Sequence, residues 1–348
     1  MDDDVTDTPP LEGRDRVLVD GVRARQPRAL AKMVTLVEST RGHDRDRASA
    51  MLDALRPHAG GSIRVGVTGS PGVGKSTFIE ALGLHLIARG LRVAVLAIDP
   101  SSTISGGSIL ADKTRMERLA QAPGAFIRPS PSGGALGGVA DKTREALLVC
   151  EAAGFDVVIV ETVGVGQSET TVAGMVDVFV LLQLPNAGDD LQAIKKGIVE
   201  LADLIVVNKA DLDPAAADRA RHQFISALAL LRPQSPHWRP PVLTVSSTSG
   251  AGIDAFWAEI EHHRATMTAT GEQTARRCRQ AVDSLWSQID AGLRARFRAH
   301  PQVRDDLQSV VLAVGAGAIS PVAASRRLLD HLDGGLSGRG GTKNEKEN

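Results

Sequence analysis

A site for nucleotide phosphates is predicted by the segment Gly69-Ser70-Pro71-Gly72-Val73-Gly74-Lys75-Ser76, which fits the phosphate-loop pattern G-x-x-x-x-G-K-[ST]. Its glycines would let backbone N–H groups turn inward around a β-phosphate, at the positive end of a helix dipole. Lys75 is then expected to reach the β- and γ-phosphates, and the Ser76 hydroxyl to bind Mg²⁺. The segment directly follows the apolar run 63–68 and precedes a helical pattern from Thr77, a context that a merely structural glycine-rich turn does not require.

A guanine-binding site is predicted by Asn208-Lys209-Ala210-Asp211, which follows an apolar run and fits the N-K-x-D pattern of GTPases. The Asp211 carboxylate would accept from the guanine N1–H and 2-amino groups, whereas adenine offers neither donor, so GTP and GDP should bind and ATP should not. Lys209 is expected to lie along the base plane, and Asn208 to tie this loop to the phosphate loop. Further along, Ser246-Ser247-Thr248 is expected to contact the guanine carbonyl through its backbone, with a plain turn as the alternative.

Two carboxylates are expected beside the phosphates. Each comes at the end of an apolar run, and these runs are expected to be strands that end on the same side of the sheet as the phosphate loop. Asp99 ends the run 93–98, and Glu161 ends the run 157–160. In a doubly wound sheet, carboxylates at these ends can hold magnesium directly or through its waters, although a helix cap is the alternative for Asp99. The backbone N–H of Gly164 is expected to touch a γ-phosphate and so to sense hydrolysis.

Short β-rich runs alternate with helix-length segments and must position these residues. The alternation predicts an α/β fold, a P-loop NTPase with a mostly parallel, doubly wound sheet. Residues 1 to about 22 show no stable periodicity, whereas Leu30, Met33, Val34 and Val37 recur at helical spacing. We therefore expect an N-terminal helical extension over 1–60 and a P-loop GTPase domain over 61–270. The β-rich runs are 63–68, 92–98, 156–161, 177–184, 203–208 and 241–245.

A long amphipathic helix is predicted beyond about residue 272, where the β-rich runs stop. Its apolar residues recur three and four positions apart; they are Cys278, Val282, Leu285, Trp286, Ile289, Leu293 and Phe297. Packing on the chain's own domain is the ordinary explanation of such a stripe. A subunit interface is the alternative, which the distance past the last strand favours. We expect a C-terminal helical dimerisation region over 271–332 and a disordered polar tail over 333–348.

Composition and charge exclude several classes of protein. The chain has 348 residues, 43% of them apolar, which is enough for one large domain with helical additions. Its 40 basic and 41 acidic side chains create no broad field for nucleic acid or an anionic membrane, so neither is expected as a partner. The acidic start of the chain and the absence of a run of about 18 apolar residues predict a cytoplasmic protein.

The longer motifs resemble those of the MeaB, ArgK and MMAA type of GTPase, in the metallochaperone-related class marked by Glu rather than Asp in E-x-x-G. The resemblance runs from about Ala29 to about Leu329. It implies a homodimeric GTP-hydrolysing chaperone that gates adenosylcobalamin delivery to methylmalonyl-CoA mutase and protects that enzyme from inactivation. The motifs are Asp99-Pro100-Ser101-Ser102, Gly106-Gly107-Ser108-Ile109-Leu110, Asp112-Lys113-Thr114-Arg115-Met116, Glu161 to Glu169, and Gly188 to Gly197.

The same resemblance implies roles for residues that spacing alone does not single out. Asp112 would join Asp99 and Glu161 around magnesium, and the loop 183–195 would be a third switch that contacts the mutase. Arg115 and Lys195 lie in matching motifs and could be rearranged by the partner to stabilise transition-state charge.

The sequence departs from the family in two stretches and from familiar GTPases at one position. Asn186 stands where the family has Gly, and since Asn tolerates positive φ the loop is expected to keep its fold. Ala135 replaces a Thr, which removes any contact of that hydroxyl. Val165 follows Gly164, where familiar GTPases carry a Gln that orients the attacking water, and Gln167 comes three residues after that glycine. Slow intrinsic hydrolysis, accelerated by a partner, is therefore predicted.

Three alternatives remain open from the sequence. A P-loop kinase for a small molecule or protein is one, although N-K-x-D argues against it. A metal-insertion GTPase for another client is the second, and it would need a Cys/His cluster. Cys150 and Cys278 lie far apart in the sequence, and His262-His263 is expected to be a solvated helix end. A binding module without turnover is the third.

Overall fold

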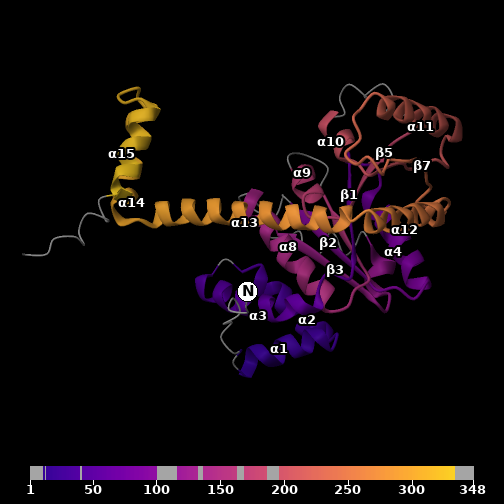
Figure 1. The fold of residues 1–348 in the computed structure, drawn as a ribbon, viewed down its shortest axis with the longest axis horizontal. Helices are drawn as coiled ribbons and strands as arrows, with labels where there is room; N and C mark the ends of the chain where they lie inside the picture. The colour runs from indigo at the N-terminus through magenta and orange to yellow at the C-terminus, as the bar shows by residue number, and fades with distance from the viewer. Residues whose placement is uncertain are drawn as a thin grey trace, which may run out of the picture. The chain divides into compact units, whose positions relative to one another are not determined.

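Seven parallel strands form one sheet in the structure, a computed structural model that describes residues 11, 13–39, 41–99, 116–131, 136–162, 168–185 and 196–333. Their spatial order is β3-β2-β4-β1-β5-β6-β7 (Figure 1), which confirms the predicted α/β fold with a parallel, doubly wound sheet. The strands are β1 (Ile63–Gly69), β2 (Val93–Asp99), β3 (Ala125–Pro131), β4 (Val157–Glu161), β5 (Val178–Gln183), β6 (Leu204–Val207) and β7 (Val242–Thr244).

Helices cover both faces of the sheet, because both faces of its strands are apolar. In β4, Val157 and Ile159 belong to one core, while Val158 and Val160 belong to the other. The helices of the first core are α4 (Lys75–Ala88), α7 (Glu117–Gln121) and α12 (Ile253–Ala269). Those of the opposite face are α8 (Leu136–Ala152), α9 (Ser168–Ala173), α10 (Lys196–Leu201) and α11 (Pro214–Ala229).

Three N-terminal helices share a core with the sheet. They are α1 (Gly13–Arg23), α2 (Pro27–Val37) and α3 (Gly42–Leu55), followed by the 3₁₀ turn η1 (Arg56–His58). Val22, Met33 and Met51 are fully buried in the same cluster as Leu96 and Val160 of the sheet. The sequence shows no stable periodicity up to about residue 22, yet α1 forms there. Most of its positions are charged or exposed, so its helix depends on packing rather than on a strong sequence pattern.

The edge strand β3 was missing from the sequence-based expectation. It contains Pro129 and Pro131, which lower the strand propensity of the segment. β3 pairs with β2 alone, so the missing N–H groups of the prolines cost little at the outer edge of the sheet. Position in the sheet, rather than local propensity, therefore decides the conformation of this segment.

Three aspartates fix the register at the amino end of the sheet. Each comes immediately before a strand, donates its own N–H to a carbonyl of the neighbouring chain segment, and accepts the N–H of that same residue on a carboxylate oxygen. The pairs are Asp156 with Arg92 at 2.8 Å, Asp177 with Arg64 at 3.0 Å, and Asp203 with Phe179 at 2.8 Å. A slip of one residue would break both bonds of a pair, so each pair specifies one alignment of parallel strands.

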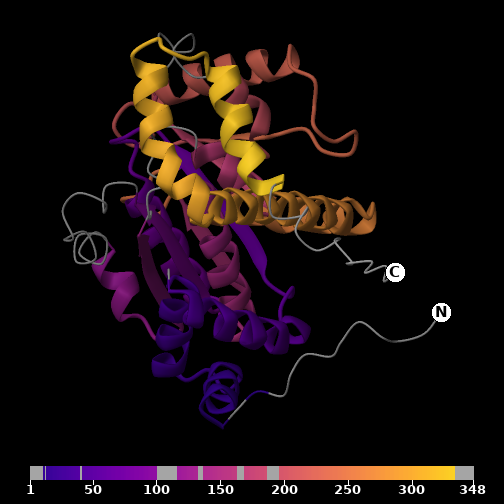
Figure 2. The same ribbon diagram turned by 90° about the vertical axis from the view of Figure 1, so that its left-hand side faces the viewer.

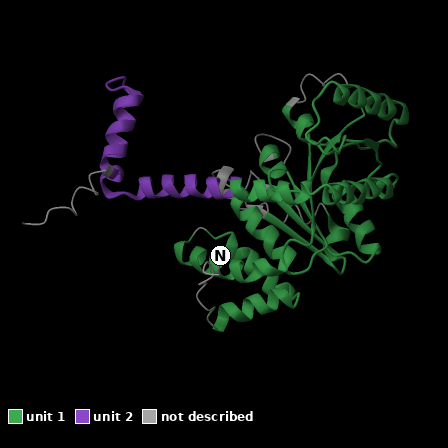
Figure 3. Ribbon diagram, in the orientation of Figure 1, with its two compact units in different colours: residues 1–282 green, residues 283–348 purple. Residues whose placement is uncertain are grey.

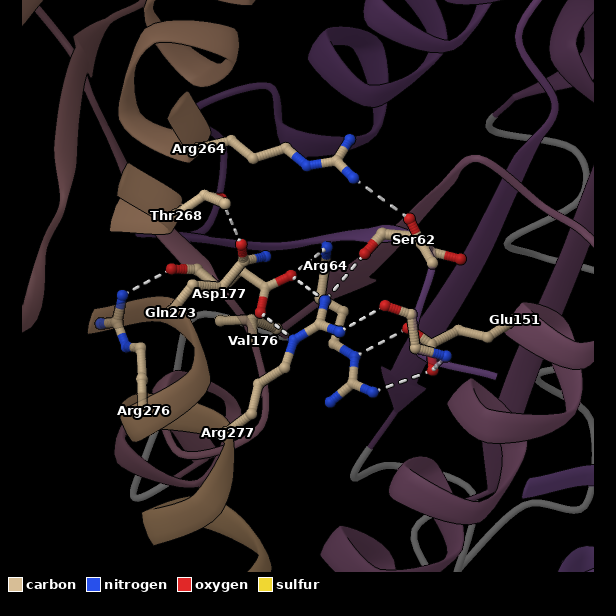
Figure 4. A network of polar contacts seen from close by, with 12 residues as sticks. Ser62, Arg64, Glu151, Val176, Asp177, Arg264, Thr268, Gln273, Arg276 and Arg277 are labelled. Carbon is tan, nitrogen blue, oxygen red and sulfur yellow. Dashed lines mark hydrogen bonds and ion pairs between the residues drawn. The ribbon is translucent and has the colours of Figure 1, made fainter. Parts of the chain in front are cut away.

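Two consecutive arginines of helix α13 (Glu272–Ala299) bond to two of these aspartates, and Figure 4 shows the pair of Arg277 with Asp177. Arg277 donates to both carboxylate oxygens of Asp177, at 2.7 and 2.6 Å, and to the carbonyl oxygen of Ser62 at 2.8 Å. Arg276 donates to Asp203 Oδ2 at 3.0 Å. Burial alone would lower the pKa of Arg277, but the hydrogen bonds and charge of Asp177 raise it above its usual value. The start of α13 is thus bonded to the amino ends of three strands or the residues just before them.

The chain forms two compact units, residues 1–282 and 283–348 (Figure 3). In the second unit, α14 (Pro301–Gly315) and α15 (Pro321–Asp333) pack side by side (Figure 2). Val310, Ala324 and Leu328 form their small core, and Arg327 donates to Asp306 at 2.9 and 2.8 Å. Within the ranges that the structure describes, no helix is long and apolar enough to cross a membrane.

The apolar stripe of α13 is largely exposed. Leu285, Trp286 and Leu293 are 56%, 62% and 57% exposed, so this part of the stripe does not pack on the chain's own domain. Of the apolar residues named for this stripe, only Phe297, near the end of the helix, packs against the core of the second unit. Exposed apolar residues in a row on one helix are typical of a surface that another chain covers.

Arg277→Gln is expected to lower the free energy of unfolding by about 3 kcal/mol, because it leaves the carboxylate of Asp177 buried without its main partner. Asp177 is 6% and Arg277 20% exposed at the side chain, which places the pair at the lower end of the range for buried pairs. Urea unfolding followed by circular dichroism measures the change. Arg279→Gln is the control, since Arg279 is exposed on the same helix and forms no hydrogen bond or ion pair within the described ranges. Equal midpoints for the two variants would contradict the assigned role of Arg277.

Candidate functional site

The phosphate-loop segment lies between β1 and α4, as its sequence pattern requires. Two of its glycines are needed for close approach. At Gly69, which has φ of +152°, a Cβ would lie 2.5 Å from the carbonyl oxygen of Leu182. At Gly74, which has φ of +92°, a Cβ would lie 2.9 Å from Nδ2 of Asn208. The loop therefore packs directly against the ends of β5 and β6, and only glycine fits at these two points.

Lys75 and Ser76 begin α4 at the carboxyl end of the sheet. The Nζ of Lys75 donates to the carbonyl oxygens of Gly69 and Ser70, at 2.8 and 3.3 Å, and so spans the loop. The Ser76 hydroxyl donates to Oε1 of Glu161 at 3.2 Å. A hydroxyl and a carboxylate oxygen this close together are the kind of donor set that Mg²⁺ takes, so the two residues fit the predicted metal site.

The ends of β1 and β4 are joined by a hydroxyl pair that the sequence analysis did not identify. Thr162 Oγ1 donates to Thr68 Oγ1 at 2.8 Å, and both residues are buried. The bond holds the chain directly after Glu161 beside the chain directly before the phosphate loop. The only sign of this pair in the sequence is a Thr at or beside the end of each of two apolar runs. Threonines are too common at such positions to predict a hydrogen bond.

Asn208 connects three loops through one buried amide. Its Nδ2 donates to the carbonyl oxygen of Val73 at 2.9 Å, which confirms the predicted tie to the phosphate loop. Its Oδ1 accepts from the N–H and the hydroxyl of Ser247, at 3.2 and 2.6 Å. The N–H of Ser247 is therefore occupied, whereas the N–H of Thr248 has no partner in the described ranges.

Lys209 and Asp211 are the other residues that are predicted to bind guanine. Lys209 adopts a positive φ of 60°, and its Nζ donates to the carbonyl oxygen of Gly72 at 2.9 Å, so its stem crosses from the base loop to the phosphate loop. Asp211 is exposed and its carboxylate has no hydrogen-bond partner among the residues described. A carboxylate without a protein partner is what the predicted contact to guanine needs.

Several predicted residues lie outside what the structure describes. They are Asp112, Arg115, Gly164 and Lys195, with Val165 and Gln167, and the side chain of Asp99. The backbone of Asp99 ends β2, which pairs with β4 so that Ala97 is opposite Glu161. This places the carboxyl end of β2 at the same edge of the sheet as Ser76 and Glu161.

The histidine pair differs from its expected position. His263 is 1% exposed in the middle of α12 and lies 3.7 Å from Asp203, so the expectation of a solvated helix end was wrong for this residue. His262 is exposed. Across the described ranges, no group of three or more His, Cys, Asp or Glu side chains is arranged to hold a metal ion. Cys150 is buried, and burial raises its pKa, whereas Cys278 is exposed.

Comparisons with known proteins find similar chains over most of the sequence. The family described as methylmalonyl Co-A mutase-associated GTPase MeaB matches residues 30–302. The GTPase ArgK of Escherichia coli is 48% identical, over 91% of this chain and 95% of its own. The mouse protein named methylmalonic aciduria type A homolog, mitochondrial, is 45% identical, over 90% of this chain and 77% of its own. A crystal structure described as LAO/AO transport system kinase superposes with a TM-score of 0.74 at 40% identity, covering 93% and 99% of the two chains.

Asp211→Asn is expected to weaken GDP binding roughly ten- to hundredfold, because a charged hydrogen bond is worth about 1.5–3 kcal/mol. Isothermal titration calorimetry with GDP and with ATP measures the effect. Asp218→Asn is a matched control, since Asp218 is an exposed aspartate on α11 outside the base loop. Tight ATP binding by the unmodified protein, or unchanged GDP affinity in Asp211→Asn, would contradict the base site.

Proposed function

This chain belongs to the MeaB family of GTPases, and on that premise we propose that its GTP hydrolysis gates the delivery of adenosylcobalamin to methylmalonyl-CoA mutase and protects that enzyme. The observation that carries the proposal is the family match over residues 30–302, whose description names association with the mutase. The relative described as a methylmalonic aciduria type A homolog supports the same client. The output of the protein would then be the state of a partner enzyme rather than a released metabolite.

Within this proposal, the nucleotide lies along one edge of the sheet. The phosphate loop Gly69 to Thr77 binds the phosphates, Asn208, Lys209 and Asp211 bind guanine, and Ser246 to Thr248 close the base site. Mg²⁺, when bound, supplies charge that neutralises the phosphates; Ser76 and Glu161 would hold it, with Asp99 and Asp112 as the other predicted ligands. Asn208 keeps the base loop and phosphate loop at a fixed separation, since its amide bonds to Val73 at 2.9 Å.

The proposed hydrolysis is slow without a partner. Val165 follows Gly164, so the side chain that orients water in familiar GTPases is absent from that position. Lys75 spans the phosphate loop and supplies one positive charge. Phosphoryl transfer is faster when a second cationic side chain also stabilises the charge of the transition state. Arg115 and Lys195 are the proposed sources of that charge when the mutase binds.

A second candidate is phosphoryl transfer to a protein or small molecule, which is favoured by the superposition on a protein described as a kinase. The open Asp211 carboxylate and the Asn208 tie are features of guanine selection and do not by themselves distinguish hydrolysis from transfer. The two candidates differ in where the γ-phosphate goes. GTP labelled in its γ-phosphate separates them: hydrolysis yields GDP and releases the label as inorganic phosphate, whereas transfer yields GDP and leaves the label on the acceptor.

A homodimer is proposed through the second unit of the chain. Its support is the exposed stripe of α13, where Leu285, Trp286 and Leu293 are more than half exposed. Burial of apolar surface at about 25 cal/mol per Å² makes such a stripe the natural contact between two copies.

The mutase is expected to accelerate single-turnover GTP hydrolysis, and Arg115→Ala or Lys195→Ala is expected to remove most of that acceleration, about hundredfold for a residue that stabilises transition-state charge. Rapid-quench assays with and without purified methylmalonyl-CoA mutase measure the rates. Lys75→Ala gives the background without turnover, and Arg118→Ala, an exposed arginine three residues after Arg115, is the control. Fast hydrolysis by the isolated protein, or no response to the mutase, would refute the proposed gating.

Replacing Leu285 and Leu293 together by Glu is expected to convert a homodimer into a monomer, because it places charges in the proposed apolar contact. Light scattering at micromolar concentration measures the mass. Substitution is preferable to truncation at residue 270, which would also remove Arg277 and its bonds to Asp177. Gln288→Glu adds a charge at an exposed polar position of the same helix and should leave the dimer intact. A monomeric unmodified protein would rule out this interface.

A further inference from the structure

A cavity of about 280 Å³ lies near the β7 edge of the sheet, between α10, α11 and the segment 231–240. Its wall is mainly apolar and includes Val199, Ile225, Leu228 and Trp238. Small-molecule sites are typically apolar hollows of about 300–1,000 Å³ with a few polar groups, so this cavity is suited to a small ligand. No residue of the predicted nucleotide site lines it.

The wall formed by 231–240 is held in place at two points. Gln234 donates from Nε2 to the carbonyl oxygen of Glu200 at 2.6 Å, and Trp238 donates from Nε1 to the carbonyl oxygen of Asp203 at 2.8 Å. Three prolines, at 233, 236 and 240, restrict the backbone of the same segment, and Pro241 follows it directly. A wall restrained by prolines and two bonds resists collapse, which favours a preformed cavity over a loose packing fault.

The charges at the cavity favour an anion. Arg232 and Arg239 line it, both are exposed, and neither forms a hydrogen bond or ion pair with another described residue. Two carboxylates also line the cavity: Asp203 is neutralised by Arg276 at 3.0 Å, and Glu200 offsets one of the two arginines, so one positive charge remains in excess. Guanidinium groups pair with carboxylates and phosphates in two-point geometry, so the unpaired arginines provide anchors for either head group.

We propose that this cavity binds a small amphipathic anion, with its hydrocarbon body against Ile225, Leu228 and Trp238 and its carboxylate or phosphate head on Arg232 or Arg239. The apolar wall excludes a fully polar anion, and the two arginines disfavour a neutral hydrocarbon. The site is separate from guanine binding: Ala202 and Asp203 line the cavity at the start of β6, and Asn208 follows its end. β6 has 4 residues, so roughly 13 Å of strand separates the two at about 3.3 Å per residue.

Octanoate, octyl phosphate and octanol test the proposal on the full-length protein. Calorimetry should find one site per chain for at least one of the two anions, with binding about tenfold or more tighter than that of octanol. The tighter anion identifies the preferred head group. The methyl resonance of Ile225, identified by its loss in Ile225→Val, should shift on titration and mark the cavity. Binding should be the same in protein saturated with GDP, so the result does not depend on the proposed nucleotide cycle.

Variants decide whether the bound anion occupies this cavity. The double variant Arg232→Gln with Arg239→Gln should weaken anion binding about tenfold and leave octanol binding unchanged. Ala229→Phe, which places a ring in the cavity, should abolish binding of all three probes. Arg219→Gln, an exposed arginine of α11 outside the lining, is the matched control and should have no effect. Equal affinity for octanol and both anions, no shift of the Ile225 methyl, or full binding by the double arginine variant would overturn the proposal.

Discussion

The alignment of the parallel strands decides where every loop of the nucleotide site begins. β1 leads into the phosphate loop, β4 ends at Glu161 and β6 leads to Asn208, so a one-residue slip of any of them would displace a functional group by about 3.3 Å. Parallel strands lack a tight turn that could set their register. Here the register is set by the aspartates directly before β4, β5 and β6, each exchanging two hydrogen bonds with one residue of the adjacent segment.

At the carboxyl end of the strands, the side-chain amide of Asn208 fixes the positions of the loops. Asn208 reaches Val73 in the phosphate loop and Ser247 after β7, so phosphate and base recognition share one buried hub. Gly74 has no side chain at the point where that amide passes. At the amino end of the sheet, aspartates bonded to backbone groups fix the strands, and at the carboxyl end the Asn208 amide, together with Lys75 and Lys209, fixes the loops.

The sequence was sufficient for the fold class and for the tie between Asn208 and the phosphate loop, while the contacts to the nucleotide stay predictions. The phosphate loop and N-K-x-D are contiguous patterns, and even the tie between Asn208 and that loop could be predicted because the family pattern carries it. β3 was missed because its two prolines are tolerated only at a sheet edge, which is a property of the assembled sheet. His263 and the aspartate pairs were missed because residues far away in the sequence surround them. For the aspartates a signal was present, an Asp directly before each of three apolar runs. It cannot be interpreted until the neighbouring strand is known.

The bonds of Arg277 have a consequence for the order in which the chain is made. Ser62 and Arg277 are separated by 215 positions, and Arg64 and Asp177 by 113. At about 5–20 residues per second, a ribosome needs roughly 10–40 s to add the residues that complete the amino end of β1. During that interval the strand that supports the phosphate loop lacks its bond to Arg277, and Asp177, which is made 100 positions before Arg277, also lacks its arginine. Synthesis of the first two turns of α13 is thus the step that completes the hydrogen bonds at this end of the sheet. The start of this helix therefore matters for the folding of the new chain as well as for the stability of the folded protein.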